Sequence, residues 1–180
     1  MGMHVQATPL PGVLVIEPEV FRDRRGSLLE AYHEARYAAA GIAGPFLQDN
    51  LSRSRGGVLR GLHFDARGRQ GKLVSVVAGE IFDVAVDLRR ESPTFARWFG
   101  ARLSGDDHRQ IYVPPGFAHG FCVLSEVADV LFKSTTLFAP EHERGVVWND
   151  LTIGIEWPLA EPELSERDAG LPSLQELMAQ

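Results

Sequence analysis

The sequence predicts a mainly β protein, most simply a jelly-roll β-sandwich with two or three short peripheral helices. The chain has 180 residues, and its 18 Gly and 11 Pro are spread over the whole length with short apolar stretches between them. Such dense punctuation is typical of many short strands, and helix signals are few. The length and the absence of long linkers or repeats favour one domain over residues 1–180.

The clearest strand signal is LVSVVAGEIFDVAVDLR, residues 73–89. We expect one strand to end at Val77 and residues 78–80 to turn the chain into a second strand. In the second strand, four apolar residues alternate with a set that contains two aspartates, so the two sets point to opposite faces. The sets are Phe82, Val84, Val86 and Leu88 against Asp83, Ala85 and Asp87. Aspartates on an inner face would indicate a polar pocket, and the alternative is a sheet edge that faces water.

Other segments predict the remaining regular structure. A strand pair is expected in RQIYVPPGFAHGFCVLS, residues 109–125, with a break at the Pro-Pro-Gly of residues 114–116. A β-rich run follows at residues 127–138, and VVWND and TIGIEW predict two short strands at residues 146–157. The Ala-rich residues 34–42 and the C-terminal PSLQELMAQ predict the short helices.

The composition limits the class of protein. Apolar residues make up 44% and charged residues 23% of the chain, as in ordinary soluble globular proteins. The net charge of -6 argues against a nucleic-acid partner, and the single Cys rules out an internal disulfide. No apolar run approaches the roughly 20 residues of a membrane helix. The start, MGMHVQATPLPGV, lacks the pattern of a signal peptide, so we expect a cytoplasmic protein without a membrane partner.

Two histidines, His63 and His119, are the candidates for chemistry, although a lone strand histidine is more often structural than catalytic. His119 ends PPGFAH, residues 114–119, which loosely matches the Pro-x-Gly-x-x-His of small metal-binding jelly rolls. A transition-metal site needs at least three converging ligands, and only two histidines are well placed. We therefore expect no metal or other cofactor, and a metal-dependent enzyme is the alternative.

Cationic side chains cluster along the sequence near these histidines. They are Arg60, Arg69, Lys72 and Arg109, and two turns add Arg24, Arg25, Arg53 and Arg55. Arg and Lys beside strand histidines in an acidic protein favour a small anionic ligand such as a diphosphate, against the alternative of solvated surface charge. The sequence has no phosphate-binding loop, dinucleotide fingerprint or serine-hydrolase elbow.

A histidine base with a nearby lysine is suited to proton abstraction beside a carbonyl group. The base removes the proton, and the ammonium stabilises the enolate oxygen that develops. A carboxylate on the far side of the ring would orient the histidine and stabilise its charged form. Asp83 and Asp168 are the two candidates for this carboxylate.

Seven strings, in order from about Val13 to Pro172, resemble the dTDP-4-dehydrorhamnose 3,5-epimerase family. The strings are FRDRRG, QDNLSRS, GVLRGLHF, QGKLVSVVAGEIFDVAVDLRRESPTF, RQIYVPPGFAHGFCVLSE, VVWNDLTIGIEWP and LSERD. The resemblance implies a metal-independent jelly roll of the cupin type that forms homodimers. It also implies an isomerase of deoxysugar biosynthesis, which inverts carbons next to the 4-keto group of a nucleotide-linked 6-deoxyhexose.

The resemblance implies roles for individual residues of these strings. His63 in RGLH would be the catalytic base, Asp168 in LSERD would pair with it, and Lys72 in QGKL would stabilise the enolate. The residues implied at the sugar and diphosphate are Arg60 and His119, and those at the nucleotide are Gln48, Asn50 and Arg24. Arg24 is expected to come from the partner subunit. Asp83 is expected behind the residues that contact the substrate. This expectation rests only on the face of the strand that Asp83 occupies in the alternating pattern.

One position departs from the family pattern where the general acid is expected. The family places a Tyr before the Lys of a Y-K-x-T string, and this chain reads F-K-S-T with Phe132 at that position. Phe keeps the ring and loses the proton donor, and general acid help is typically about 10²–10⁴-fold. The three tyrosines, Tyr32, Tyr37 and Tyr112, lie outside the strings where the family places its acid.

The departure leaves three outcomes for the expected activity. Water or another side chain returns the proton, the enzyme inverts one carbon only with carbon 3 the first choice, or the chain binds the sugar nucleotide and turns over poorly. Two smaller departures bear on how the nucleotide is held. Ser27-Leu28 stands for the F-F of the family's RGFF string, and Arg167 stands for the Lys of LSxKD.

Overall fold

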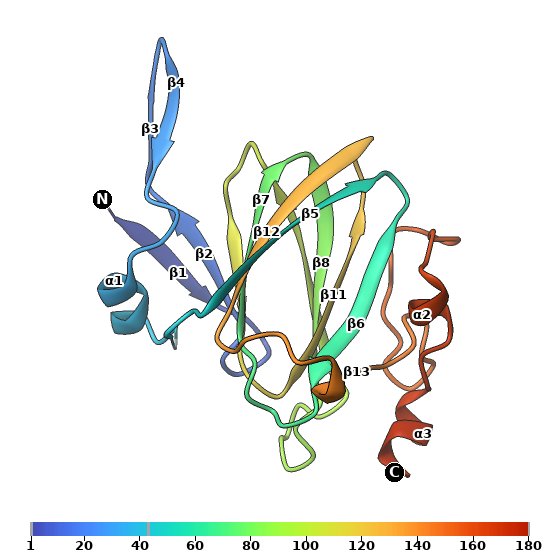
Figure 1. Cartoon of the computed structure of the whole chain (residues 1–180). Coiled ribbons are helices and arrows are strands. Elements are labelled where there is room, and N and C mark those ends of the chain that lie inside the picture. Colours follow the sequence, from blue (N-terminus) through green and yellow to red (C-terminus); the bar gives the residue numbers. More distant parts are fainter. Residues whose placement is uncertain (1, 43, 180) are drawn as a thin grey trace.

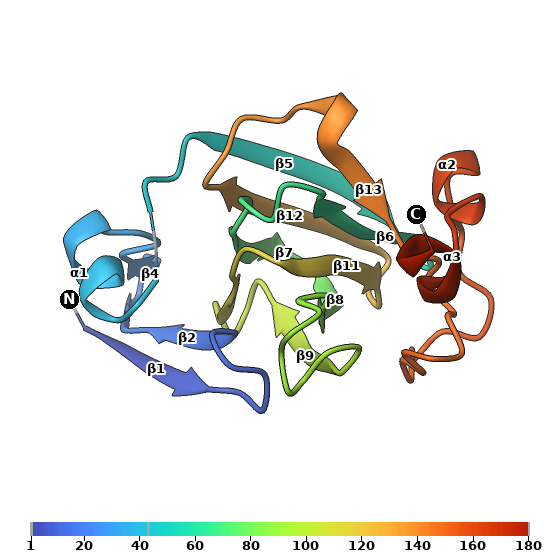
Figure 2. The same ribbon diagram turned by 90° about the horizontal axis from the view of Figure 1, so that it is seen from below.

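The computed structural model describes residues 2–42 and 44–179, which form two facing antiparallel β-sheets (Figures 1 and 2). The six-stranded sheet consists, in spatial order, of β1 (Met3–Ala7), β2 (Leu14–Pro18), β10 (Gln110–Val113), β7 (Lys72–Ala78), β12 (Val127–Ser134) and β5 (Gln48–Arg55). The five-stranded sheet consists of β13 (Glu143–Gly145), β6 (Leu59–Asp65), β11 (Phe117–Val123), β8 (Glu80–Asp87) and β9 (Trp98–Ser104). The predicted mainly β jelly-roll sandwich is confirmed.

Within the described residues, three short helices and a hairpin lie outside the two sheets. The helices are α1 (Glu34–Ala39), α2 (Glu166–Ala169) and α3 (Leu174–Met178), with a 3₁₀ turn at Pro140–His142. The hairpin of β3 (Val20–Asp23) and β4 (Gly26–Leu29) projects away from the sandwich (Figure 1). None of the described helices is long and apolar enough to span a membrane. The predicted first and last helices are confirmed, and α2 is a helix that the sequence pattern did not predict.

The space between the sheets is divided into an apolar part and a polar part. Val76 and Val130 of the six-stranded sheet share one buried cluster with Ile81 and Phe121 of the five-stranded sheet. Further along β7 and β12, the same inward face carries Lys72 and other polar side chains. A jelly roll stabilised by a core at one end can therefore leave the other end open for a ligand.

The position of β8 shows whether its aspartates face a polar interior or water, a question that the sequence left open. Its apolar set, from Phe82 to Val86, packs outward under the C-terminal segment with Leu174 and Trp157. The aspartate set points inward, and both Asp83 and Asp87 are fully buried. β8 lies between β11 and β9, so the alternative of a sheet edge facing water is wrong.

The predicted strands of residues 73–89 and 109–125 form, but the members of each pair lie in different sheets. The chain passes from β7 in the six-stranded sheet to β8 in the five-stranded sheet, and likewise from β10 to β11. Gly79 makes the first passage with φ of +81°, and a Cβ at this position would lie 2.1 Å from the Val127 carbonyl oxygen. Because the chain crosses from one sheet to the other at these two points, consecutive strands lie on opposite sides of the same interior.

The prediction of two short strands at residues 146–157 is wrong. The carboxylate of Asp150 accepts hydrogen bonds from the backbone N–H groups of Thr152, Ile153 and Leu174, which turns the chain and ties it to α3. Val146 and Ile153 pack on the outer face of the five-stranded sheet. The alternating apolar residues therefore serve packing without a strand ladder.

Candidate active site

A cavity of about 500 Å³ lies at the polar end of the sandwich, within the range of small-molecule sites. One wall comes from β6 and β11 of the five-stranded sheet and the opposite wall from β5, β7 and β12 of the six-stranded sheet. The α2 segment adds a third side with Ser165, Arg167 and Asp168. The cavity therefore gathers residues from segments far apart in the sequence.

His63 and Asp168 form a hydrogen-bonded pair at this cavity. The Nε2 atom of His63 lies 2.6 Å from Oδ1 of Asp168, and the backbone N–H of Gly61 donates to the other carboxylate oxygen at 3.3 Å. The N–H of Asp168 donates to Ser165, which caps α2 and fixes the position of the carboxylate. Burial opposes the charge of Asp168, but the bonds from His63, Gly61 and Ser165 outweigh it and lower its pKa.

The backbone around Gly61 explains how His63 reaches this position. Gly61 has φ of +115°, and a Cβ there would lie 2.7 Å from both Gly120 Cα and the His119 carbonyl oxygen. The close approach of β6 and β11 at this point requires glycine. His63 is 22% exposed through its side chain, and its Nδ1 makes no hydrogen bond to any residue of the described ranges. The ring is thus held from behind and accessible from the cavity.

Lys72 lies at the start of β7 on the wall opposite His63. Its ammonium group forms no hydrogen bond with the part of the chain that the structure describes. Burial lowers the pKa of Lys72 to about 8, and the negative charges of Glu143 and Asp83 limit the decrease. A half-buried cation without a hydrogen-bond partner in the described residues is available to an oxyanion in the cavity.

His119 and Asp83 form a second pair beside the first. The Nε2 atom of His119 lies 2.8 Å from Oδ2 of Asp83, and His119 faces His63 in the register of β11 and β6. His119 lines the cavity, and Asp83 lies behind it, fully buried, with Oδ1 lacking a hydrogen-bond partner. Asp83 therefore lies behind a cavity-lining residue and does not line the cavity itself.

Three more of the expected residues line the cavity, and one does not. Arg60 donates from Nε to the Ser54 hydroxyl at 2.9 Å, and Gln48 donates to Asn50 at 2.9 Å. Arg24 is exposed in the turn of the β3–β4 hairpin and does not line the cavity of its own chain. Of the other clustered cations, Arg69 and Arg109 also lie outside the cavity lining.

Phe132 lines the cavity from β12, on the wall opposite His63. None of the three tyrosines lines the cavity, since Tyr32, Tyr37 and Tyr112 belong to an apolar cluster elsewhere. The described cavity lining therefore contains no phenolic hydroxyl.

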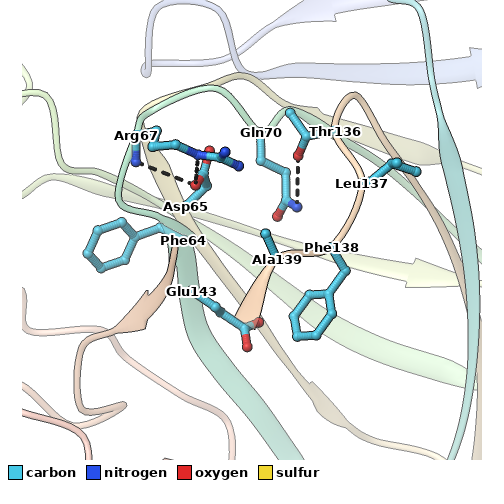
Figure 3. Close-up of a pocket in the computed structure, with 9 residues that line it drawn as sticks. All are labelled: Phe64, Asp65, Arg67, Gln70, Thr136, Leu137, Phe138, Ala139 and Glu143. Atoms are coloured by element: carbon cyan, nitrogen blue, oxygen red, sulfur yellow. Dashed lines mark hydrogen bonds and ion pairs between the residues drawn. The ribbon is translucent and has the colours of Figure 1, made fainter. Parts of the chain in front are cut away.

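The rim of the cavity contains residues that the sequence did not single out for the site. Figure 3 shows the small depression beside the cavity, about 10 Å³ in volume, which shares Gln70, Phe138 and Glu143 with it. Glu143 forms an ion pair with Arg167, which also lines the cavity. The sequence had marked Arg167 only as a departure from the family's LSxKD string, and no local signal marks Glu143.

The described residues offer no metal centre. Across residues 2–42 and 44–179, no group of three or more His, Cys, Asp or Glu side chains could hold a metal ion. The PPGFAH segment supplies only His119, whose Nε2 is already bonded to Asp83. What the site offers instead is a histidine base, a cation facing it and several hydrogen-bonding groups.

Known proteins resemble this chain over nearly its whole length. The sequence profile described as dTDP-4-dehydrorhamnose 3,5-epimerase matches residues 7–176. A protein of that name from Pseudomonas aeruginosa is 55% identical over 168 residues, which cover 92% of this chain and 93% of the relative.

Two solved structures also match over nearly the whole chain. The dTDP-6-deoxy-D-glucose-3,5-epimerase of Legionella pneumophila, in complex with dTDP-4-keto-L-rhamnose, is 46% identical with a TM-score of 0.94, covering 97% of this chain and 94% of that one. A 3'-monoepimerase from Streptomyces bikiniensis, in complex with dTDP-quinovose, is 33% identical with a TM-score of 0.88, covering 96% and 91%. The chain thus belongs to the dTDP-4-dehydrorhamnose 3,5-epimerase family and is an isomerase.

Proposed function

We propose that the chain inverts carbon 3, carbon 5 or both of a dTDP-linked 4-keto-6-deoxyhexose. The observation that carries the proposal is the His63–Asp168 pair, 2.6 Å apart, on a cavity wall that faces Lys72. The Legionella relative in complex with dTDP-4-keto-L-rhamnose supports the substrate class. Nothing in this chemistry requires a cofactor, because the 4-keto group itself acidifies the neighbouring carbons.

In the proposed mechanism His63 is the base. Asp168 accepts a hydrogen bond from the Nε2–H group of His63, which leaves the lone pair of the neutral ring on Nδ1, toward the cavity. Nδ1 takes the proton from the carbon beside the ketone, and the C–H electron pair becomes the double bond of the enolate. The Lys72 ammonium stabilises the negative charge on the former carbonyl oxygen. Return of a proton to the opposite face of that carbon completes the inversion.

The remaining cavity residues are proposed to hold the substrate. Arg60 and His119 are suited to the sugar and diphosphate, because a guanidinium group donates to anionic oxygens and the second ring nitrogen of His119, Nδ1, is not used by Asp83. Gln48 and Asn50, at the start of β5, are proposed for the nucleotide. Asp83 acts as a positioning residue, since it contacts His119 and does not itself line the cavity.

We also propose a homodimer of single-domain subunits in which Arg24 reaches the partner's nucleotide. Arg24 lies in the turn of the projecting hairpin, whose Phe21 and Leu28 are 45% and 62% exposed. Large exposed apolar side chains on a projecting element favour an interface. Mixing Arg24→Ala and His63→Ala subunits should restore activity, because a mixed dimer contains one intact site. No recovery in mixed dimers would overturn the shared site.

Two narrower alternatives rest on particular observations. Inversion of carbon 3 alone is favoured by the likeness to a 3'-monoepimerase. A weakly active sugar-nucleotide binder is favoured by Phe132, which leaves the described cavity lining without a phenolic proton donor. These alternatives predict different fates for the hydrogens on carbons 3 and 5.

Proton NMR of dTDP-4-keto-6-deoxyglucose with the enzyme in heavy water separates the candidates. The proposal predicts deuterium entry and inversion at carbon 3, carbon 5 or both, and one labelled carbon identifies a monoepimerase. Calorimetric binding without deuterium entry would identify a binding protein and contradict the proposed activity. His63→Ala, which should bind without exchange, is the control.

A further inference from the structure

An inverting enzyme must supply a proton from the side opposite its base, and this chain lacks the expected donor. His63 acts from β6 in the five-stranded wall, while Phe132 occupies the opposite wall and has no exchangeable proton. The tyrosines lie outside the cavity lining. His119 does not solve the problem, because it is the register neighbour of His63 on the same wall.

Among the described residues that line the cavity from the six-stranded sheet, Lys72 is the one group that ionises near neutral pH. The other polar members of this wall are Gln48, Asn50, Ser52 and Ser134. Amides and aliphatic hydroxyls are hydrogen-bonding groups and not acids in this range. Lys72 differs, because burial lowers its pKa to about 8, close to where an efficient general acid should lie.

Lys72 is also next to the position that Phe132 occupies. Lys72 pairs with Ser134 across β7 and β12, and Phe132 is two residues further along β12 on the same face. Diagonal neighbours of this kind lie about 7–8 Å apart at the backbone, within reach of a long side chain. The ammonium group has no hydrogen bond to a described residue, so all three of its N–H groups are available.

We propose that Lys72 returns the proton that completes inversion, in place of the hydroxyl that Phe132 lacks. The inference rests on the proposed epimerase function and deepens it. His63 takes the proton from carbon and becomes an imidazolium. Lys72 then gives one N–H proton to the opposite face of the enolate carbon, the carbonyl re-forms, and Lys72 is left as a neutral amine. His63 loses its proton to water and Lys72 regains one, so the cycle balances.

Lys72→Arg tests the role, because Arg keeps the positive charge beside the enolate and does not give up its proton. Two rates are measured by NMR in heavy water: deuterium entry with retained configuration and formation of the inverted product. We expect Lys72→Arg to lower inversion by about 10²-fold or more and deuterium entry by less than about tenfold. Lys133→Arg is the matched control, since Lys133 pairs with Asp49 and does not line the cavity.

Adding Phe132→Tyr to Lys72→Arg supplies a new donor on the same wall. Inversion should recover by at least about tenfold, because the phenol replaces the missing acid. Such a rescue also shows that the Lys72→Arg chain is folded and binds substrate. Inversion by Lys72→Arg at the native rate would overturn the proposal, and so would an equal loss of both rates without rescue. A native chain with neither rate would overturn the epimerase function itself.

The ratio of inversion to deuterium entry gives an independent pH test. In the native chain this ratio should fall above about pH 8, where Lys72 is neutral, while Phe132→Tyr should keep it constant to higher pH. The charged or titratable groups that face Lys72 across the cavity are Arg60, His63, His119, Glu143, Arg167 and Asp168, with Asp83 behind His119. All remain in the Phe132→Tyr chain, so an identical profile in both chains would overturn the proposal.

Discussion

Two His–Asp pairs lie side by side in this protein, and they differ in what surrounds them. His63 and His119 are register neighbours on β6 and β11, and each ring contacts a carboxylate through Nε2, at 2.6 and 2.8 Å. The carboxylates come from different places: Asp83 from the adjacent strand β8 and Asp168 from α2. One His–Asp pair is therefore formed within the five-stranded sheet. The other is formed between that sheet and the C-terminal segment that contains α2.

Access and hydrogen bonding distinguish the pairs. The side chain of His63 is 22% exposed and that of His119 is 7% exposed. Both oxygens of Asp168 accept hydrogen bonds, whereas Oδ1 of Asp83 is buried without a partner. The comparison indicates that a His–Asp contact alone does not identify a base. The ring must also reach the substrate, and its carboxylate must be held in the charged form.

The largest expected effect separates the two histidines. His63→Asn should lower kcat by about 10³-fold or more, because it removes the base and not the fold. His119→Asn should change kcat by less than about tenfold and mainly raise KM, since His119 is assigned to binding. Steady-state kinetics of both variants on the 4-keto sugar nucleotide measure this. Equal losses of kcat would remove the distinction between the pairs.

Asp168→Asn should have the second largest effect, lowering kcat by about 10²-fold with little change in KM. The amide keeps the shape but no longer stabilises the imidazolium that forms when His63 takes a proton. Ser165→Ala is the milder companion, because it loosens the α2 cap and leaves the carboxylate charged. A kcat for Asp168→Asn within threefold of the native value would argue that Asp168 is structural.

Asp83→Ala should affect stability more than chemistry. The change leaves His119 buried without its partner, which costs about 1–3 kcal/mol of unfolding free energy, while kcat falls by less than about tenfold. Urea denaturation and steady-state kinetics measure the two quantities. A catalytic loss as large as that of Asp168→Asn would place Asp83 in the reaction.

The smallest expected effect is a pH dependence of stability. The pKa of Asp168 is lowered in the folded chain from its ordinary 3.8, so its contribution is present above about pH 4 and is lost as pH falls through the folded value. The stability difference between native and Asp168→Asn chains should therefore shrink below pH 4. Hydrogen bonds from Arg89, Ser92 and Thr94 hold the pKa of Asp87 at about 2 against the effect of burial. The stability difference between the native and Asp87→Asn chains should therefore persist to lower pH. Urea denaturation at several pH values checks both.

The sequence predicted the elements whose signals are local. Alternation along β8 put Asp83 on the face opposite the apolar set, although it left open which face is buried, and the Ser173 capping box marks the start of α3. Alternation failed at residues 146–157, because Asp150 turns the chain and the apolar residues serve packing. The division of β7 and β8 between two sheets also has no local signal, since a turn residue does not show which sheet follows.

The site was only partly predictable for the same reason. His63 and Asp168 are 105 residues apart, and their meeting depends on how the C-terminal segment docks on the sheet. The family resemblance suggested the pair, and residue spacing alone could not. Glu143 entered the cavity lining through the short pairing of β13 with β6, which three residues are too few to reveal.

The central claim is that His63 removes the proton beside the ketone. The most direct measurement follows the release of deuterium from a dTDP-4-keto sugar labelled at carbons 3 and 5, in ordinary water and in a single turnover. The native and His119→Asn chains should release deuterium from at least one carbon, and His63→Asn should release none above the uncatalysed rate. Release by His63→Asn at the native rate would contradict the account.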